Sequence, residues 1–176
     1  MSTSEFPLAP PWQVSQWFNT AQPLALAALR GRVVVLHAFQ MLCPGCVAHG
    51  LPQAQRVHAR FQGDEVVVVG LHTVFEHHAA MTPVSLAAFI HEYRIAFAVG
   101  VDQAHEHDPI PCTMQAYGLR GTPSLVVIDR LGRMRLHEFG QVDDFALGVF
   151  LGRLLSEDPS QPPGAPHPSY NSSGFA

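Results

Sequence analysis

The 176-residue chain lacks lysine, and its ten basic residues are all arginine, against fourteen acidic residues. The resulting net charge of -4 gives no electrostatic reason to expect binding to nucleic acid or to an anionic membrane. No apolar run approaches the roughly 20 residues that a membrane-spanning helix needs, because the longest ones, such as 66–71, have strand length. No GxGxxG fingerprint follows a strand, so neither flavin nor nicotinamide is expected.

Cysteine is also scarce: the chain has three, and an odd number argues against a scaffold held together by disulfides. The first six residues (MSTSEF) lack the basic start and apolar core of a signal peptide, so we expect a cytoplasmic protein. Thiols are mostly reduced in the cytoplasm. The closely spaced pair Cys43 and Cys46 is therefore predicted to be redox-active or metal-binding rather than structural.

Length and composition predict one globular domain, since 47% of the residues are hydrophobic and enough apolar surface is available for a core. We place this domain at residues 12–157, after an irregular segment over 1–11. Residues 158–176 (DPSQPPGAPHPSYNSSGFA) are rich in proline and poor in aliphatic side chains, which predicts a flexible tail.

Within the domain, β-branched runs alternate with segments of helical periodicity. This alternation predicts an α/β fold with a parallel core, and a glycine turn after residue 128 adds a hairpin that makes the sheet mixed. We expect strands over 33–39, 65–71, 97–101, 124–128 and 134–139, and helices over 46–61, 83–95, 111–117 and 143–155.

The cysteine pair lies between the strand predicted for 33–39 and the helix that follows it. At a helix N-terminus, free backbone N–H groups and the helix dipole stabilise a thiolate, so Cys43 is expected to have a lowered pKa. Cys46 lies about one turn further on and can close a disulfide with it. The CxxC spacing also occurs in half of a structural zinc site. The chain has no second CxxC to complete such a site, but its eleven histidines could supply the remaining ligands, so zinc binding stays an alternative.

Two segments together resemble the thioredoxin superfamily. GRVVVLHAFQMLCPGC (31–46) is similar to its active-site strand and motif, and LRGTPSLVVIDRLGRMRLHEFG (119–140) is similar to its cis-proline and hairpin. The resemblance implies a thioredoxin-like fold in which Pro123 is cis and packs against the disulfide, while the Thr122 backbone binds substrate peptide. About 80 residues separate Cys43 from Pro123, which implies an inserted strand–helix unit, and PLALAALRG (23–31) is similar to the TlpA-like and redoxin branch.

The chain departs from the family pattern at two places near the cysteines. Leu42 occupies the position that usually holds tryptophan, and the dipeptide between the cysteines is Pro-Gly instead of Gly-Pro. The dipeptide helps to set the redox potential in the family, so the direction of electron flow stays open.

His37 lies six residues before Cys43, where thioredoxin has a buried acid that shuttles the proton of the second cysteine. It shares one strand face with Val33, Val35 and Phe39, which predicts that its ring points under the helix toward Cys46. A histidine that titrates near neutrality could act as the base. The alternative is a buried histidine bonded to the backbone.

The motifs predict a thiol–disulfide oxidoreductase without metal or cofactor: Cys43 attacks, Cys46 resolves, and Thr122 with Pro123 forms the substrate platform. Its partners would be protein or small-molecule disulfides and a dithiol electron donor. One alternative is an antioxidant peroxidase of redoxin type with Cys43 as the peroxidatic cysteine, although Leu36 and Gln40 replace the proline and the threonine or serine of peroxiredoxins.

Another alternative is a redox-sensing or copper-binding module, in which a histidine from the loops would join the two thiolates. The candidates are His72, His77, His78, His105 and His107. Cys112 is either a resolving or regulatory thiol or a small buried hydrophobic residue. Met41 and Leu42 are expected to form an apolar rim for the substrate.

Overall fold

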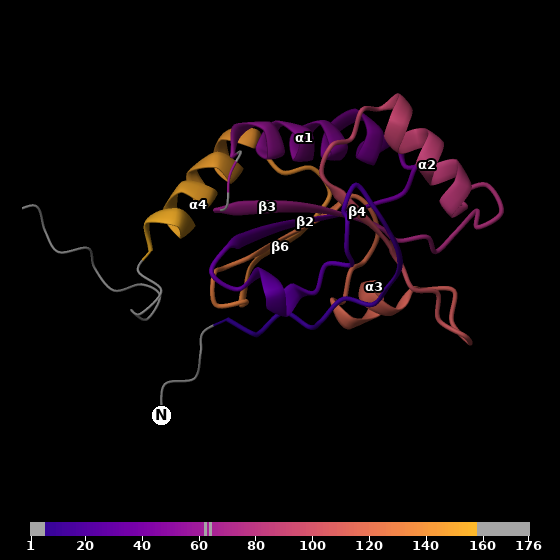
Figure 1. Ribbon diagram of the computed structural model, residues 1–176, viewed down its shortest axis with the longest axis horizontal. Coiled ribbons are helices and arrows are strands. Elements are labelled where there is room, and N and C mark those ends of the chain that lie inside the picture. Colours follow the sequence, from indigo (N-terminus) through magenta and orange to yellow (C-terminus); the bar gives the residue numbers. More distant parts are fainter. Residues whose placement is uncertain (1–5, 62, 64, 158–176) are drawn as a thin grey trace, which may run out of the picture.

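The computed structural model describes residues 6–61, 63 and 65–157, so the predicted tail over 158–176 lies outside the described residues. A six-stranded mixed sheet runs through the molecule in the order β1-β4-β3-β2-β5-β6 (Figure 1). Its strands are β1 (Val14–Phe18), β2 (Val33–Phe39), β3 (Val66–His72), β4 (Ala98–Asp102), β5 (Ser124–Ile128) and β6 (Met134–Phe139). The central strands β2, β3 and β4 are parallel, whereas β1, β5 and β6 each pair antiparallel with a neighbour.

Helices cover both faces of the sheet (Figure 1). One face carries η2 (Cys46–Gly50), α1 (Leu51–Arg60), α2 (Pro83–Glu92) and α4 (Asp144–Ser156), and the other carries η1 (Leu26–Leu29) and α3 (Cys112–Ala116). Two apolar clusters fill the two interfaces, because successive side chains of a strand point to opposite faces. In the described part of the chain, no helix has the length and apolarity needed to cross a bilayer.

The predicted α/β architecture is confirmed, including the mixed sheet and the extra strand–helix unit before Pro123. β2, β5 and β6 have the predicted bounds, and the other predicted strands and helices are present, with ends that differ by up to three residues. Between α1 and Pro123 the chain forms two units, β3–α2 and β4–α3.

The edge strand β1 was not predicted from the sequence. It is short, with two of its five residues exposed and three half-buried, and its sequence VSQWF does not alternate regularly between apolar and polar side chains. It packs closely on Gly100 of β4, where a Cβ would lie 3.0 Å from the methyl groups of Val14. The strand therefore depends on a tertiary contact that its own sequence does not display.

A buried carboxylate ties α3 to the end of β4. Asp102 accepts hydrogen bonds from the Thr73 hydroxyl at 2.9 Å and from the backbone N–H groups of Thr113 and Met114 at 2.8 and 2.9 Å. These bonds satisfy N–H groups that the first turn of a helix leaves unpaired. They fix α3, which leads through Gly118 into the loop that carries Pro123.

His72 is a strand residue, contrary to its expected place in a loop. It ends β3, is buried, and lies beside Phe39 with ring centroids 5.3 Å apart. Within the described residues neither of its ring nitrogens has a hydrogen-bond partner. Burial disfavours the charged imidazolium and lowers the pKa of His72 from 6.5 to about 4.

We expect this histidine to make the fold sensitive to acid. Between pH 6.5 and 4 the unfolded chain binds a proton at His72 that the folded chain does not, so the free energy of unfolding falls as the pH falls. The loss should reach up to about 3 kcal/mol for a shift of this size. Urea titrations at pH 7, 5 and 4 should show a weaker pH dependence for His72→Leu.

The matched control is His91→Leu, since the side chain of His91 is 87% exposed. This variant should retain the pH dependence of the parent protein. Equal pH slopes for His72→Leu and His91→Leu would contradict the assignment.

Candidate active site

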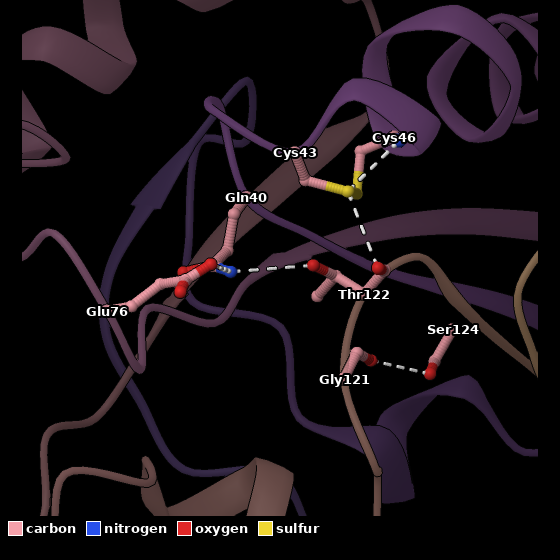
Figure 2. The surroundings of a disulfide bond; sticks show 7 residues. All are labelled: Gln40, Cys43, Cys46, Glu76, Gly121, Thr122 and Ser124. Atoms are coloured by element: carbon pink, nitrogen blue, oxygen red, sulfur yellow. Dashed lines mark hydrogen bonds between the residues drawn. A yellow bond between two sulfur atoms is a disulfide. The ribbon is translucent and has the colours of Figure 1, made fainter.

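Cys43 and Cys46 form a disulfide at the point where the chain leaves β2 and enters η2, with their Cα atoms 5.2 Å apart (Figure 2). Cys43 is half-buried, whereas Cys46 has no exposed surface. Cys43 therefore presents surface to an incoming substrate, whereas Cys46 does not.

The sulfur of Cys43 caps the helix that begins at Pro44. The backbone N–H of Cys46 donates to the Cys43 Sγ at 3.2 Å, which is the hydrogen bond that an N-cap side chain accepts from the third helical residue. Pro44 occupies the first helical position, where its missing N–H removes no helical bond. A thiolate on Cys43 would be stabilised by the same N–H and by the helix dipole.

The first turns of this helix are wider than in an α-helix. The N–H of Leu51 bonds to the carbonyl of Cys46, five residues earlier, and Pro52 follows directly. Proline has no N–H, and its ring interferes with the carbonyl four residues before it, which favours a π-turn at this place. The turn brings Gly50 onto the sheet.

His37 lies directly beneath Gly50. A Cβ at Gly50 would overlap with Nε2 of His37 and would lie 3.3 Å from Cβ of Pro123, so glycine is required where helix, strand and loop meet. The ring points under the helix, as expected from the strand face, and its contact is with Gly50, one turn after Cys46.

The peptide bond between Thr122 and Pro123 is cis, and the loop faces the disulfide (Figure 2). The Cys43 Sγ lies 3.4 Å from the carbonyl oxygen of Thr122. Gly45 faces the proline ring, since a Cβ there would approach Cδ of Pro123 to 3.2 Å. The Pro-Gly order thus places the residue without a side chain against the loop.

Gln40 joins three segments around the site and was not recognised as a site residue from the sequence. Its Nε2 donates to Oε1 of Glu76 at 3.4 Å and to Oγ1 of Thr122 at 3.5 Å (Figure 2). Its Oε1 accepts from the N–H of Phe75 at 3.4 Å. The side chain is almost fully buried. The available signals were its position directly after β2 and its place three residues before Cys43, where peroxiredoxins have threonine or serine.

The electrostatic state of His37 differs from the sequence expectation. Burial lowers the pKa of His37 from 6.5 to about 4, so the ring is neutral at pH 7 and does not titrate near neutrality. Neither ring nitrogen has a hydrogen-bond partner among the described residues, which disagrees with the backbone-bonded alternative.

A pocket of about 250 Å³ reaches His37 from the side of α4. Its polar lining residues include His49, Gln53, Arg56, Asp143 and Asp144. Gln53 closes one wall by donating to the carbonyl of Val142 at 2.8 Å and to Asp144 at 2.7 Å. Polar walls of this kind can hold water next to a buried imidazole.

The other candidate residues are dispersed. Leu42 is 58% exposed beside the disulfide, as expected for an apolar rim, but Met41 is buried in the core and does not contribute to a rim. Cys112 is a free, half-buried thiol at the start of α3, on the opposite face of the sheet from η2 (Figure 1).

The histidines of the loops remain at the surface. His77, His78, His105 and His107 are exposed. Among the described residues, no three His, Cys, Asp or Glu side chains gather into a group able to hold a metal ion. The copper alternative, which needs both cysteines and one histidine, therefore gains no support.

The chain is similar to solved structures of thioredoxin-like proteins. It is 59% identical to a thioredoxin-like superfamily protein, covering 86% of this chain and 97% of that one, with a TM-score of 0.84. It is 52% identical to a thiol-disulfide isomerase from Corynebacterium glutamicum, covering 89% of this chain and all of that one, also with a TM-score of 0.84. The fold is thus thioredoxin-like.

A curated relative, the protein DipZ from Mycobacterium bovis, is 25% identical over 146 residues, or 82% of this chain. The chain spans only about a fifth of the length of the DipZ proteins that it matches. Residues 8–137, most of the domain including both cysteines of the pair and Pro123, match the sequence profile of the AhpC/TSA family. The chain belongs to the AhpC/TSA family, as a redoxin of the thioredoxin superfamily.

Proposed function

We propose that this protein is a thiol–disulfide oxidoreductase that exchanges disulfides through Cys43 and Cys46. The observation that carries the proposal is the asymmetry of the pair: Cys43 is accessible and receives an N–H bond, whereas Cys46 is fully buried. A site built in this way has one sulfur for substrate and one for resolution. The similarity to a thiol-disulfide isomerase supports the same activity.

In the reducing direction, the Cys43 thiolate attacks one sulfur of a substrate disulfide and the other sulfur leaves as a thiolate. Cys46, deprotonated, then attacks Cys43 Sγ, which breaks the mixed disulfide and releases the second substrate thiolate. Two electrons pass to the substrate, and the protein is left with the Cys43–Cys46 disulfide. A dithiol partner restores the reduced pair by the reverse exchange.

Thr122 and Pro123 form the platform on which the substrate lies. The Thr122 carbonyl lies close to the attacked sulfur, and Gly45 places no side chain of its own against the proline ring. The Gln40 amide donates a hydrogen bond to the Thr122 hydroxyl and so restrains this loop. Leu42 adds an exposed apolar contact, which suits the side chains of a protein substrate.

His37 serves as the acceptor for the Cys46 proton. Its ring is neutral at pH 7 because burial holds its pKa at about 4, so a lone pair is available in the working range. The pocket on the α4 side offers a route by which the proton can leave toward solvent. The low pKa makes the imidazole a weak base, and we expect a moderate contribution to the rate.

Peroxide reduction is the second candidate, suggested by membership of the AhpC/TSA family. Two observations favour exchange over it. Leu36 packs into the apolar cluster on the opposite face of the sheet from His37, and the Gln40 amide is engaged with Thr122 and Glu76. Leu36 has no hydrogen-bond donor, and the Gln40 amide already donates to Glu76 and Thr122, so neither side chain offers a free donor to a peroxide at Cys43. The cytoplasmic location remains a prediction.

The primary test compares insulin reduction, thiol-dependent peroxide consumption and Cu(I) titration in the same preparations. The wild type should reduce insulin with dithiothreitol as donor, Cys43→Ser should lose the activity entirely, and Cys46→Ser should accumulate a mixed disulfide that mass spectrometry detects. Cys112→Ser is the matched control and should retain full activity. Rapid peroxide turnover without insulin reduction would overturn the proposal, as would a Cys43→Ser variant that still reduces insulin.

The role of His37 is tested with His37→Leu against His72→Leu. The two histidines lie on the same face of the sheet, are equally buried and have similarly lowered pKa values, so both variants should perturb stability in a similar way. Only His37→Leu should slow exchange at pH 7, by about tenfold, which is less than the roughly 10²–10⁴-fold typical of general bases because the low pKa of His37 makes it a weak base. Its rate should recover as the pH rises, since hydroxide then deprotonates Cys46 directly.

The measurement is the pH profile of exchange under single-turnover conditions. Equal rates for the two variants at pH 7, or a His37→Leu profile parallel to that of the wild type, would exclude proton transfer through His37.

A further inference from the structure

The outward face of α4 is apolar and has no partner within the described chain. Phe145 is 81% exposed and Val149, one turn later, is 44% exposed. Gly148 and Gly152 lie between and beside them, and a Cβ at either glycine would meet nothing within 4 Å. A contiguous exposed apolar patch, rather than a single exposed side chain, is typical of an interaction site.

The same face continues into a groove between α1 and α4. The groove has a volume of about 160 Å³. Its apolar lining residues are Val57, Phe61, Leu147 and Leu151, and it is also lined by Gly148 and by the polar side chains of Gln53, Arg56, Arg60 and Asp144. α4 lies at one end of the helical layer, with α1 beside it (Figure 1). A protruding aromatic ring and a receiving apolar groove therefore occur together on one surface.

The spacing of these residues is self-complementary. If two copies of α4 pack antiparallel about an axis between Gly148 and Val149, Phe145 of each copy lies opposite Gly152 of the other, and Val149 lies opposite Gly148. Each large side chain thus meets a glycine, which allows the two backbones to approach closely. The groove borders Gly148, which lies one turn before Gly152 on the same helix. The ring of Phe145, placed opposite Gly152, can therefore reach the edge of the groove.

The charges at the two ends of α4 favour the antiparallel arrangement. The helix begins with Asp143 and Asp144 and carries Arg153 in its last turn. Asp144 also pairs with Arg56 at 2.8 Å, so the acidic end of the face is fixed in position. In the antiparallel arrangement Arg153 of one copy approaches Asp143 and Asp144 of the other, whereas a parallel arrangement would bring like charges together.

We propose that the protein forms a two-fold symmetric homodimer through antiparallel packing of α4, with Phe145 as the anchor in the α1–α4 groove of the second copy. A C2 interface requires one surface to be complementary to itself, and this face satisfies the requirement in shape and in charge. The anchor is of the residue class that dominates binding energy at interfaces. The inference does not depend on the redox function.

The test is the mass of the full chain by sedimentation velocity from low-micromolar to near-millimolar concentration. The wild type should reach twice the 19.2 kDa of one chain, and Phe145→Arg should raise the dissociation constant at least about 30-fold, as expected for loss of an interface anchor. Val84→Arg is the matched control, because Val84 is an apolar residue of α2 with 82% exposure, outside this face. It should dimerise as the wild type does.

A wild type that stays monomeric at all concentrations overturns the proposal. So does a dimer that Phe145→Arg leaves intact, or one that Val84→Arg disrupts equally. Insulin reduction by Phe145→Arg should equal that of the wild type, which shows that the variant is folded and separates this test from that of the proposed function.

The direction of packing is tested by cross-linking in a chain whose three cysteines are replaced by serine. Gly148→Cys lies next to the proposed axis and should form a covalent dimer on mild oxidation. Ser156→Cys is exposed at the end of the same helix, where antiparallel packing separates the two copies of this position by roughly 20 Å. Ser156→Cys should remain uncross-linked, and efficient cross-linking at Ser156 with none at Gly148 would contradict the antiparallel arrangement.

Discussion

The site depends on the close approach of the cysteine-bearing helix to the loop that carries Pro123. Two glycines make this approach possible, because Gly45 leaves room for the proline ring and Gly50 leaves room for both His37 and Pro123. A side chain at Gly50 would displace a buried ring or lift the helix from the sheet. The contact places the attackable sulfur beside the Thr122 carbonyl and keeps the second sulfur enclosed.

Burial acts differently on the parts of this site. It removes Cys46 from solvent, so that only a group already at Cys43 can react with it. It also keeps His37 uncharged, because an imidazolium without a partner would lose its hydration. His72 shows a similar desolvation beside Phe39, so it allows the cost of burying a histidine to be compared with the effect of changing His37.

Elements whose own residues show a clear pattern were predicted well from the sequence. An element that forms only through contacts with a distant segment was not. β2 begins with three β-branched valines and is buried on both faces over all seven residues, so its own sequence suffices to set its bounds. β1 exists because Gly100 of another strand accepts its side chains. Met41 was expected at the surface beside Leu42, but the turn after β2 directs adjacent residues to opposite sides, one into the core and one outward.

The sequence by itself determined the α/β order of elements, the position of Cys43 and Cys46 between a strand and a helix, and the pairing of that motif with a distant Thr-Pro. Periodicity and spacing along the chain suffice for the first two features, since each depends on neighbours within a few residues, whereas the pairing with the distant Thr-Pro was implied by the resemblance to the thioredoxin superfamily. Only the tertiary structure decided which sulfur is accessible, that His37 is neutral beneath Gly50, and that Gln40 links Thr122 to Glu76. These properties arise from desolvation and from contacts between segments far apart in the chain, and neither is encoded in a local pattern.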